Sequence, residues 1–262
     1  MTTGYKNELN IANSYHNKQF SNLNDFQQQI IKRIFPKVND ETIIQCFLSS
    51  NKIGKPDIYF VVDGEYKFIS IKSGITDSMH FESIKSFILF LRGLGVSVKT
   101  QKILLLYHYG DGTMDGTGSK RMLYDELVLK NRENIDFATK ELAKYEIVLA
   151  SLNRFVFCGT DNCQNEVDYI YYGDEKYGVL CSREDLTNFV IGKNYSHYKT
   201  MHIGPMSIQP YLRDPDRISK HPYKRDIVQI KWHYLLTDLE IANSKSRYYS
   251  WKVKQYKKSR KY

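Results

Sequence analysis

The stretch KPDIYFVVDGEYKFISIK, residues 55–72, decides the fold of the chain. Two runs rich in β-branched and aromatic residues lie on either side of the pair Asp63-Gly64. An Asp-Gly pair between such runs is the strongest short-range signal for a β-hairpin with a two-residue turn. The sequence therefore predicts two antiparallel strands joined at this pair.

The expected pairing of the hairpin places three polar residues on one face. If the turn has two residues, Val62 faces Glu65, and counting outward from this pair puts Asp57 opposite Ser70. Facing residues of paired strands share a face. Lys72 lies two residues beyond Ser70 and therefore points to the same side. The pattern predicts that a carboxylate, a hydroxyl and an amine converge at the open end of the hairpin.

These residue types suit the hydrolysis of a phosphodiester bond. The carboxylate of Asp57 can bind Mg²⁺, and the Lys72 amine can orient or activate the attacking water and offset charge on the phosphorane. Mg²⁺ commonly takes one or two protein carboxylates, but the position two residues before the lysine is Ser70. The next candidate is Glu82, at the start of a helix predicted over residues 78–93 from its apolar spacing.

These motifs resemble a known enzyme family. Lys55-Pro56-Asp57, the hairpin, Ser70-Ile71-Lys72 and the downstream Glu82 are similar to PD-(D/E)XK nucleases. The nearest resemblance is to restriction-endonuclease variants whose second carboxylate has moved from the strand to the following helix, leaving a Ser or Cys behind. The similarity covers roughly residues 20–110, including a Ser-x-His-x-Glu stretch at residues 78–82.

The resemblance implies a type II restriction-type endonuclease that cuts double-stranded DNA at a specific sequence with Mg²⁺ as cofactor. It implies a homodimer and a cognate DNA methyltransferase in the same system. The metal ligands would be Asp57 and Glu82. The implied catalytic residues are Asp57, Ser70, Lys72, His80 and Glu82.

Two acidic alternatives and one histidine role stay open. His80 would contact a phosphate or hold Glu82, or it is a helix-start residue without chemistry. Some relatives place another acid on the helix before the hairpin, and Glu41 is the candidate for that position. A short helix with an N-cap at Asn39 or Asp40 is expected there. Either Glu82 or Glu41 would then complete the metal site.

The rest of the chain predicts an α/β fold. The resemblance implies a restriction-endonuclease-like core, a central mixed β-sheet flanked by helices, over residues 1–153. Residues 154–262 are expected to form a β-rich DNA-recognition lobe with a basic C-terminal tail. Helices are expected at 23–35, 120–150 and 183–190, strands at 102–107, 167–172, 178–181, 202–212 and 226–232, and a Gly-rich loop without a P-loop ending at 109–119.

The positive net charge of the chain and its concentration near the C-terminal end favour a nucleic-acid partner. The net charge is +9, and residues 245–262 carry eight Lys/Arg and no acid, interleaved with aromatic rings. Such a segment suits a phosphate backbone, although a solubilising tail would have the same composition. Candidate DNA contacts, with a solvated surface as the alternative for each, are Arg213, Arg217, Lys224, Arg225 and Lys231.

Cysteines and hydropathy bear on the compartment. The chain has no apolar run of membrane-spanning length, no signal peptide is visible, and the expectation is a cytoplasmic protein without a membrane partner. Free thiols fit a reducing compartment. Alternatively, Cys158, Cys163 and Cys181 are zinc ligands completed by His197 or His202.

Two further functions are kept beside restriction. One is a structure-specific repair or junction nuclease that uses the same core. The other is a non-catalytic DNA-binding protein with a degenerate core, an option that Ser70 keeps open because it stands where a second carboxylate is expected.

Overall fold

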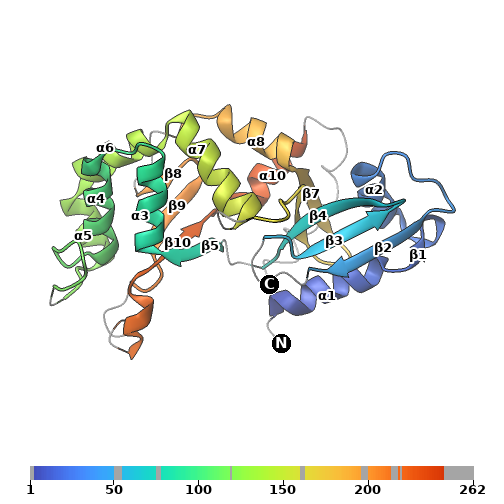
Figure 1. Ribbon diagram of the computed structural model, residues 1–262, viewed down its shortest axis with the longest axis horizontal. Helices are drawn as coiled ribbons and strands as arrows, with labels where there is room; N and C mark the ends of the chain where they lie inside the picture. Colours follow the sequence, from blue (N-terminus) through green and yellow to red (C-terminus); the bar gives the residue numbers. More distant parts are fainter. Residues whose placement is uncertain are drawn as a thin grey trace. The chain divides into compact units, whose positions relative to one another are not determined.

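The computed structural model describes residues 3–49, 55–74, 78–118, 120–159, 163–195, 200–213, 218 and 220–244. The chain divides into two compact units (Figure 1). Unit 1 comprises Met1–Thr76, Val156–Phe189 and Leu235–Tyr262, and unit 2 comprises Asp77–Phe155 and Val190–Tyr234. Each unit takes segments from both sides of residue 153, so the units do not follow the expected division into 1–153 and 154–262.

A mixed β-sheet forms the centre of unit 1. Its strands lie in the order β1-β2-β3-β4-β6-β7, and all neighbours are antiparallel except β4 and β6, which are parallel. The expected α/β class with a mixed sheet is thereby confirmed. The strand bounds are β1 Lys18–Gln19, β2 Ile43–Leu48, β3 Ile58–Val62, β4 Glu65–Lys72, β6 Tyr169–Gly173 and β7 Gly178–Ser182.

Helices bury one face of this sheet. Ile11 of α1 and Ile31 of α2 belong to a buried cluster that also holds Ile58, Phe60 and Ile69 of the hairpin strands. α2 begins with a capping box at its N-cap, which stabilises the first turn. The helices with residues in unit 1 are α1 Thr3–Tyr15, α2 Asp25–Ile34, α8 Arg183–Ile191 and α10 Leu235–Ser244, with a short 3₁₀ turn η1 Phe20–Asn22 and a π-helix η2 Asn153–Cys158.

Unit 2 combines helices with a second, antiparallel sheet in the order β5-β10-β9-β8. Its strands are β5 Ser78–Ser83, β8 His202–Ile203, β9 Met206–Pro210 and β10 Ile227–Lys231. Its helices are α3 Ile84–Gly93, α4 Val98–Tyr109, α5 Tyr124–Lys130, α6 Arg132–Leu142 and α7 Tyr145–Leu152, with a 3₁₀ turn η3 Pro222–Lys224. In the described part of the chain, no helix is long and apolar enough to cross a membrane.

Most predicted elements are confirmed. The hairpin forms as β3 and β4, and both turn residues have positive φ, 50° at Asp63 and 80° at Gly64, as the turn type requires. Helix α2, the helices between residues 120 and 150, the strands β6, β7 and β10, and helix α8 occur where they were expected. The strand expected over 202–212 is divided into β8 and β9 by a turn at Gly204.

Two predicted elements are of the wrong type. Residues 43–48, expected in a helix after Asn39, form strand β2. Residues 102–107, expected as a central strand, lie inside helix α4, because Ser97 caps its first turn and Gly110 ends it in a left-handed conformation. A continuous apolar run fits a buried helix as well as a buried strand, so its periodicity could not separate the two.

A third predicted element begins too early. The helix expected over 78–93 is strand β5 up to Ser83, and helix α3 begins only at Ile84. The Ser83 side chain accepts a hydrogen bond from Ser86 N at 3.0 Å and so fixes the helix start. His80 and Glu82 are therefore strand residues, which corrects their expected place on a helix.

Candidate functional site

The register of the hairpin agrees with the pairing expected from the turn. Val62 pairs with Glu65, and Ile58 pairs with Ile69. The ladder continues one residue further, because the Asp57 N–H donates to the Ile69 carbonyl at 2.9 Å. Asp57 therefore lies beside Ser70, as expected.

The Asp57 carboxylate is held in one orientation by β4. Its Oδ2 atom accepts hydrogen bonds from the Ser70 hydroxyl at 3.0 Å and from the Ile71 N–H at 2.5 Å. Ser70 is fully buried, so its hydroxyl supports the carboxylate from within the protein. Among the described residues, the hydrogen bonds to this carboxylate all end on Oδ2, which leaves Oδ1 for a further partner.

Lys72 lies next to this carboxylate. Its Nζ is 3.6 Å from Asp57 Oδ2 and donates to the Ile71 carbonyl at 3.1 Å. The side chains of Lys72 and Asp57 are 19% and 25% exposed, so both remain accessible to a ligand. Asp57, Ser70 and Lys72, which the sequence placed on one face, are thus brought together.

A second carboxylate near this group was missed in the sequence. Glu8 lies on α1 and is partly buried. Burial raises the pKa of Glu8, the nearby Asp57 carboxylate raises this pKa further, and Lys72 opposes the rise. Glu8 therefore interacts electrostatically with both Asp57 and Lys72. The signal that could have found it is the spacing of Ile11 and Tyr15, which marks an apolar helix face early in the chain.

A second lysine belongs to the same group. Burial lowers the pKa of Lys55 to about 7, Lys72 lowers it as well, and Asp57 opposes the shift. The stem of Lys55 packs against Gly159, where an added Cβ would lie 3.0 Å from Lys55 Cγ. The name hairpin cluster is used from here on for Glu8, Lys55, Asp57, Ser70 and Lys72.

Glu82 and His80 contact a different set of residues. Both are on β5 in unit 2, whereas the hairpin cluster is in unit 1. Glu82 Oε2 is 2.7 Å from Arg154 Nη2, with side chains only 9% and 10% exposed, and His80 Nε2 lies 3.9 Å from Glu82 Oε1. The Arg154 guanidinium also lies over the Phe90 ring, 4.7 Å from its centroid. His80, Glu82 and Arg154 are called the Arg154 cluster below.

Among the described residues, the other expected metal ligands do not form a group of three or more that could hold a metal ion. Glu41 is exposed in a turn before β2. Cys158 and Cys163 interact with each other. Burial, and to a smaller extent the neighbouring Cys163 thiol, raises the pKa of Cys158 to about 12. Cys181 is buried in unit 1, His202 lies in unit 2, and His197 is outside the described residues. Within the described residues, no group of three or more His, Cys, Asp and Glu side chains could hold a metal ion.

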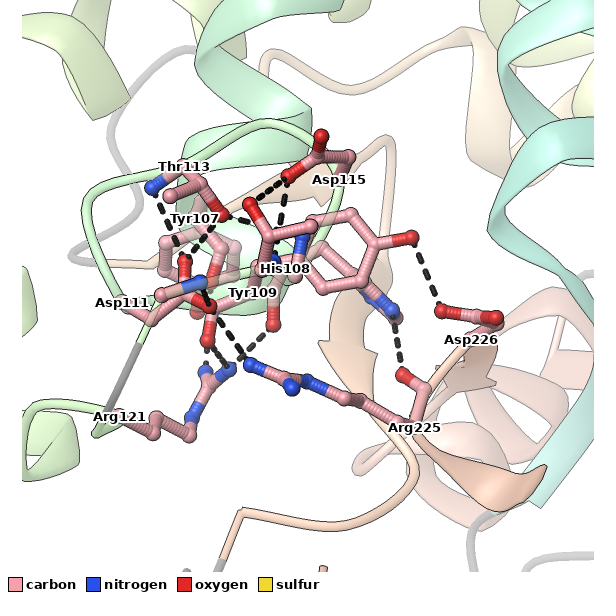
Figure 2. A network of polar contacts seen from close by, with 12 residues as sticks. Tyr107, His108, Tyr109, Asp111, Thr113, Asp115, Arg121, Arg225 and Asp226 are labelled. Atoms are coloured by element: carbon pink, nitrogen blue, oxygen red, sulfur yellow. Dashed lines mark hydrogen bonds and ion pairs between the residues drawn. The ribbon is translucent and has the colours of Figure 1, made fainter. Parts of the chain in front are cut away.

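One of the expected DNA contacts is engaged in a polar network of unit 2 (Figure 2). Arg225 Nη2 lies 2.6 Å from Asp111 Oδ2, whose side chain is fully buried, and the Arg225 carbonyl bonds to His108 Nε2 at 2.9 Å. Arg121 donates to the Tyr109 carbonyl at 2.6 Å and so satisfies the end of α4. The Arg225 guanidinium therefore stabilises the Gly-rich loop.

The remaining expected DNA contacts lie on the surface of unit 2 or outside the described residues. Arg213 lies over the Tyr124 ring, 4.9 Å from its centroid. Lys224 lies near the rings of Tyr211 and Tyr223, 5.4 and 5.6 Å from their centroids. Lys231 ends β10. Arg217 and the basic segment 245–262 lie outside the described residues.

Comparison with known proteins adds no relative. A scan against protein-family models found no match, and a search of curated proteins also found none.

Proposed function

We propose that this protein is a metal-dependent nuclease that hydrolyses phosphodiester bonds in DNA, with the hairpin cluster as its active site. The observation that carries the proposal is the Asp57 carboxylate, fixed by Ser70 and the Ile71 N–H, with Lys72 Nζ at 3.6 Å and a second carboxylate, Glu8, interacting with both. A carboxylate pair beside amines suits a site that receives both a cation and a phosphate.

The donor set fits Mg²⁺. This ion prefers oxygen ligands and is held in many enzymes by one or two carboxylates together with substrate phosphate and water. Asp57, through Oδ1, and Glu8 would hold it. Burial and then the Asp57 charge raise the pKa of Glu8, and a bound cation would relieve the repulsion between the two carboxylates. A bound Mg²⁺ would supply positive charge that stabilises the phosphorane.

The protein's own residues have separable tasks. Ser70 and the Ile71 N–H hold Asp57 in one orientation, so that the site does not reorganise when substrate binds. Lys72, which is partly exposed, binds a phosphate oxygen and orients the attacking water. Lys55, with a pKa lowered to about 7, adds a second amine at the same end of the hairpin.

The fold is compatible with the family resemblance. The resemblance implies a central mixed sheet flanked by helices, and unit 1 contains a mixed sheet with α1 and α2 packed on one face. In this proposal, Glu8 takes the role of the acid on the helix before the hairpin, which the sequence had given to Glu41. Glu82 is less suited to the metal site, because Arg154 already balances its charge.

The restriction-type form of the proposal adds a specific sequence in double-stranded DNA, a homodimer and a cognate methyltransferase. A homodimer suits a palindromic target, because cutting both DNA strands needs two active sites related by twofold symmetry. The second candidate is a structure-specific repair or junction nuclease that uses the same cluster. It is favoured by exposed aromatic rings on the face of the sheet that carries Asp57 and Lys72.

The test is digestion of plasmid, single-stranded and branched DNA by the purified full chain, with Mg²⁺ and with EDTA. Cleavage that needs Mg²⁺ and is lost in Asp57→Asn and Lys72→Met would support the proposal. Discrete duplex fragments would indicate restriction, whereas preferential cutting of branched DNA would indicate the second candidate. No cleavage of any substrate, with DNA binding unaffected by these substitutions, would favour a non-catalytic DNA-binding protein.

A further inference from the structure

An aromatic row lies on the same face of the unit 1 sheet as Asp57, Ser70 and Lys72. It consists of Phe47 on β2, Tyr59 on β3, and Tyr66 and Phe68 on β4. Phe47 pairs with Tyr59, and Tyr59 pairs with Phe68, so these three rings lie side by side across neighbouring strands. Alternate residues of a strand share a face, which puts the row on the side of Asp57, Ser70 and Lys72.

The rings contact one another as a continuous surface. The Phe47 and Tyr59 rings are stacked with centroids 5.2 Å apart, and those of Tyr59 and Tyr66 are stacked at 6.2 Å. The Phe68 centroid lies 5.9 Å from that of Tyr59. Whereas the opposite face buries Ile58, Phe60 and Ile69, Tyr66 is 56% exposed and the other three rings are partly exposed.

The row leads directly to the hairpin cluster. Tyr59 is two residues from Asp57 on β3, and Phe68 is two residues from Ser70 on β4, a separation of roughly 7 Å along a strand. Next to the rings, the same face carries the neutral residues Gln45 and Val61, which pair with each other. Gln45 and Val61 therefore add no charge beside the rings, whereas Asp57 and Lys72 lie at one end of the row. The Asp168 carboxylate adjoins Phe68, whose N–H donates to its Oδ2 at 2.8 Å.

We propose that the aromatic row binds unpaired bases of a single DNA strand and directs that strand into the hairpin cluster. Bases stack on aromatic rings without regard to sequence, and the phosphates of the same strand need cations beside them. The row supplies the rings, and Lys72, whose Nζ lies 3.6 Å from Asp57 Oδ2, supplies a cation. This inference depends on the proposed nuclease function, and it narrows the substrate to DNA with a single-stranded or opened segment.

The experiment compares binding and cleavage in the full-length protein. Binding is measured in an Asp57→Asn background by anisotropy of a labelled oligonucleotide and by fluorescence of 2-aminopurine within it, which stacking quenches. Tyr66→Ala is expected to weaken single-strand binding by roughly 5- to 100-fold and to remove the quenching. Tyr66→Phe, which keeps the ring, retains both. Tyr145→Ala is the matched control, because Tyr145 is 58% exposed but lies on α7.

A second pair of variants keeps the inference testable if Tyr66→Ala folds poorly. Gln45 is exposed beside the row, so Gln45→Glu is expected to weaken single-strand binding several-fold and Gln45→Lys to strengthen it. Circular dichroism melts establish that each variant is folded.

The outcomes separate the two proposals. If the wild-type protein cleaves DNA but Tyr66→Ala and Gln45→Glu bind and cut single strands as it does, the aromatic row has no such role, and the nuclease proposal stands. If no DNA is cut but binding depends on Tyr66 as expected, the row binds bases and the nuclease proposal fails. A wild-type dimer that dissociates on Tyr66→Ala, with oligonucleotide binding unchanged, would assign the row to a second copy of the chain.

Discussion

The hairpin cluster and the Arg154 cluster both place a carboxylate beside cations, yet their environments differ. Asp57 is 25% exposed, and the amine of Lys72, on a flexible side chain, is 3.6 Å away. Glu82 is 9% exposed and meets an arginine at 2.7 Å, and that arginine also lies on an aromatic ring. A carboxylate already neutralised by a fixed guanidinium has little charge left for a metal, whereas Asp57, beside a second carboxylate, retains it.

The strongest way to test this difference is to remove each carboxylate charge. Asp57→Asn keeps an acceptor for the Ile71 N–H, so the fold is expected to persist while cleavage falls by roughly 10³-fold. Glu82→Gln is expected to leave the cleavage rate of the folded protein unchanged. Single-turnover cleavage with excess enzyme measures both. An equal loss in Glu82→Gln would return Glu82 to the metal site, as the sequence first indicated.

The second test removes the cation of each cluster instead of the carboxylate and measures stability. Arg154→Met leaves the Glu82 carboxylate buried without the Arg154 guanidinium, and the free energy of unfolding should fall by about 3–5 kcal/mol. Lys72→Met removes a partly exposed pair and should change it by less than about 1 kcal/mol. Urea denaturation at neutral pH measures both variants. A larger loss for Lys72→Met would mean that the hairpin cluster is mainly structural.

A third test asks whether other buried polar groups of unit 2 are also structural. Burial lowers the pKa of His108 from 6.5 to about 4, although its bond to the Arg225 carbonyl opposes the shift. The unfolded chain therefore binds more protons between these pH values, and stability is lost as the pH falls from 6.5 toward 4. Over this pH range, the wild-type protein should lose on the order of 3 kcal/mol of unfolding free energy through His108, and the His108→Gln variant should lack this loss. Identical acid denaturation profiles for the two proteins would contradict this.

The smallest expected effect concerns the second carboxylate. Glu8→Gln removes one negative charge beside Asp57, so the Mg²⁺ concentration for half-maximal cleavage should rise by roughly tenfold. Glu41→Gln is the control, because Glu41 is exposed in a turn. Cleavage rates measured over a series of Mg²⁺ concentrations give the shift. A similar shift in both variants would show only a general loss of negative charge.

The hairpin could be predicted from sequence because its signals are local. The Asp63-Gly64 turn fixes the register, and the register fixes which residues share a face. The position of Asp57, Ser70 and Lys72 on one face follows from this register. The turn and both strands lie within one short stretch, so no distant part of the chain had to be known.

The interaction of Glu8 with Asp57 could not be predicted in the same way. Glu82 was selected because it follows the hairpin in sequence, but Ser83 caps helix α3 and leaves Glu82 on a strand of the other unit. Glu8 interacts electrostatically with Asp57 from helix α1. This interaction depends on how α1 packs against the sheet. The spacing of residues within the hairpin carries no information about that packing.

The parallel pairing of β4 with β6 has a consequence for folding. Ser70 pairs with Ile170, and the chain between these strands includes the first segment of unit 2. During translation, the hairpin is therefore synthesised well before β6, the strand that pairs with the edge of β4. Contacts between such distant residues slow folding, and an unpaired edge can join another chain. We expect nascent chains that stop before residue 169 to aggregate through β4, and a chaperone that shields strand edges to raise the yield of folded protein.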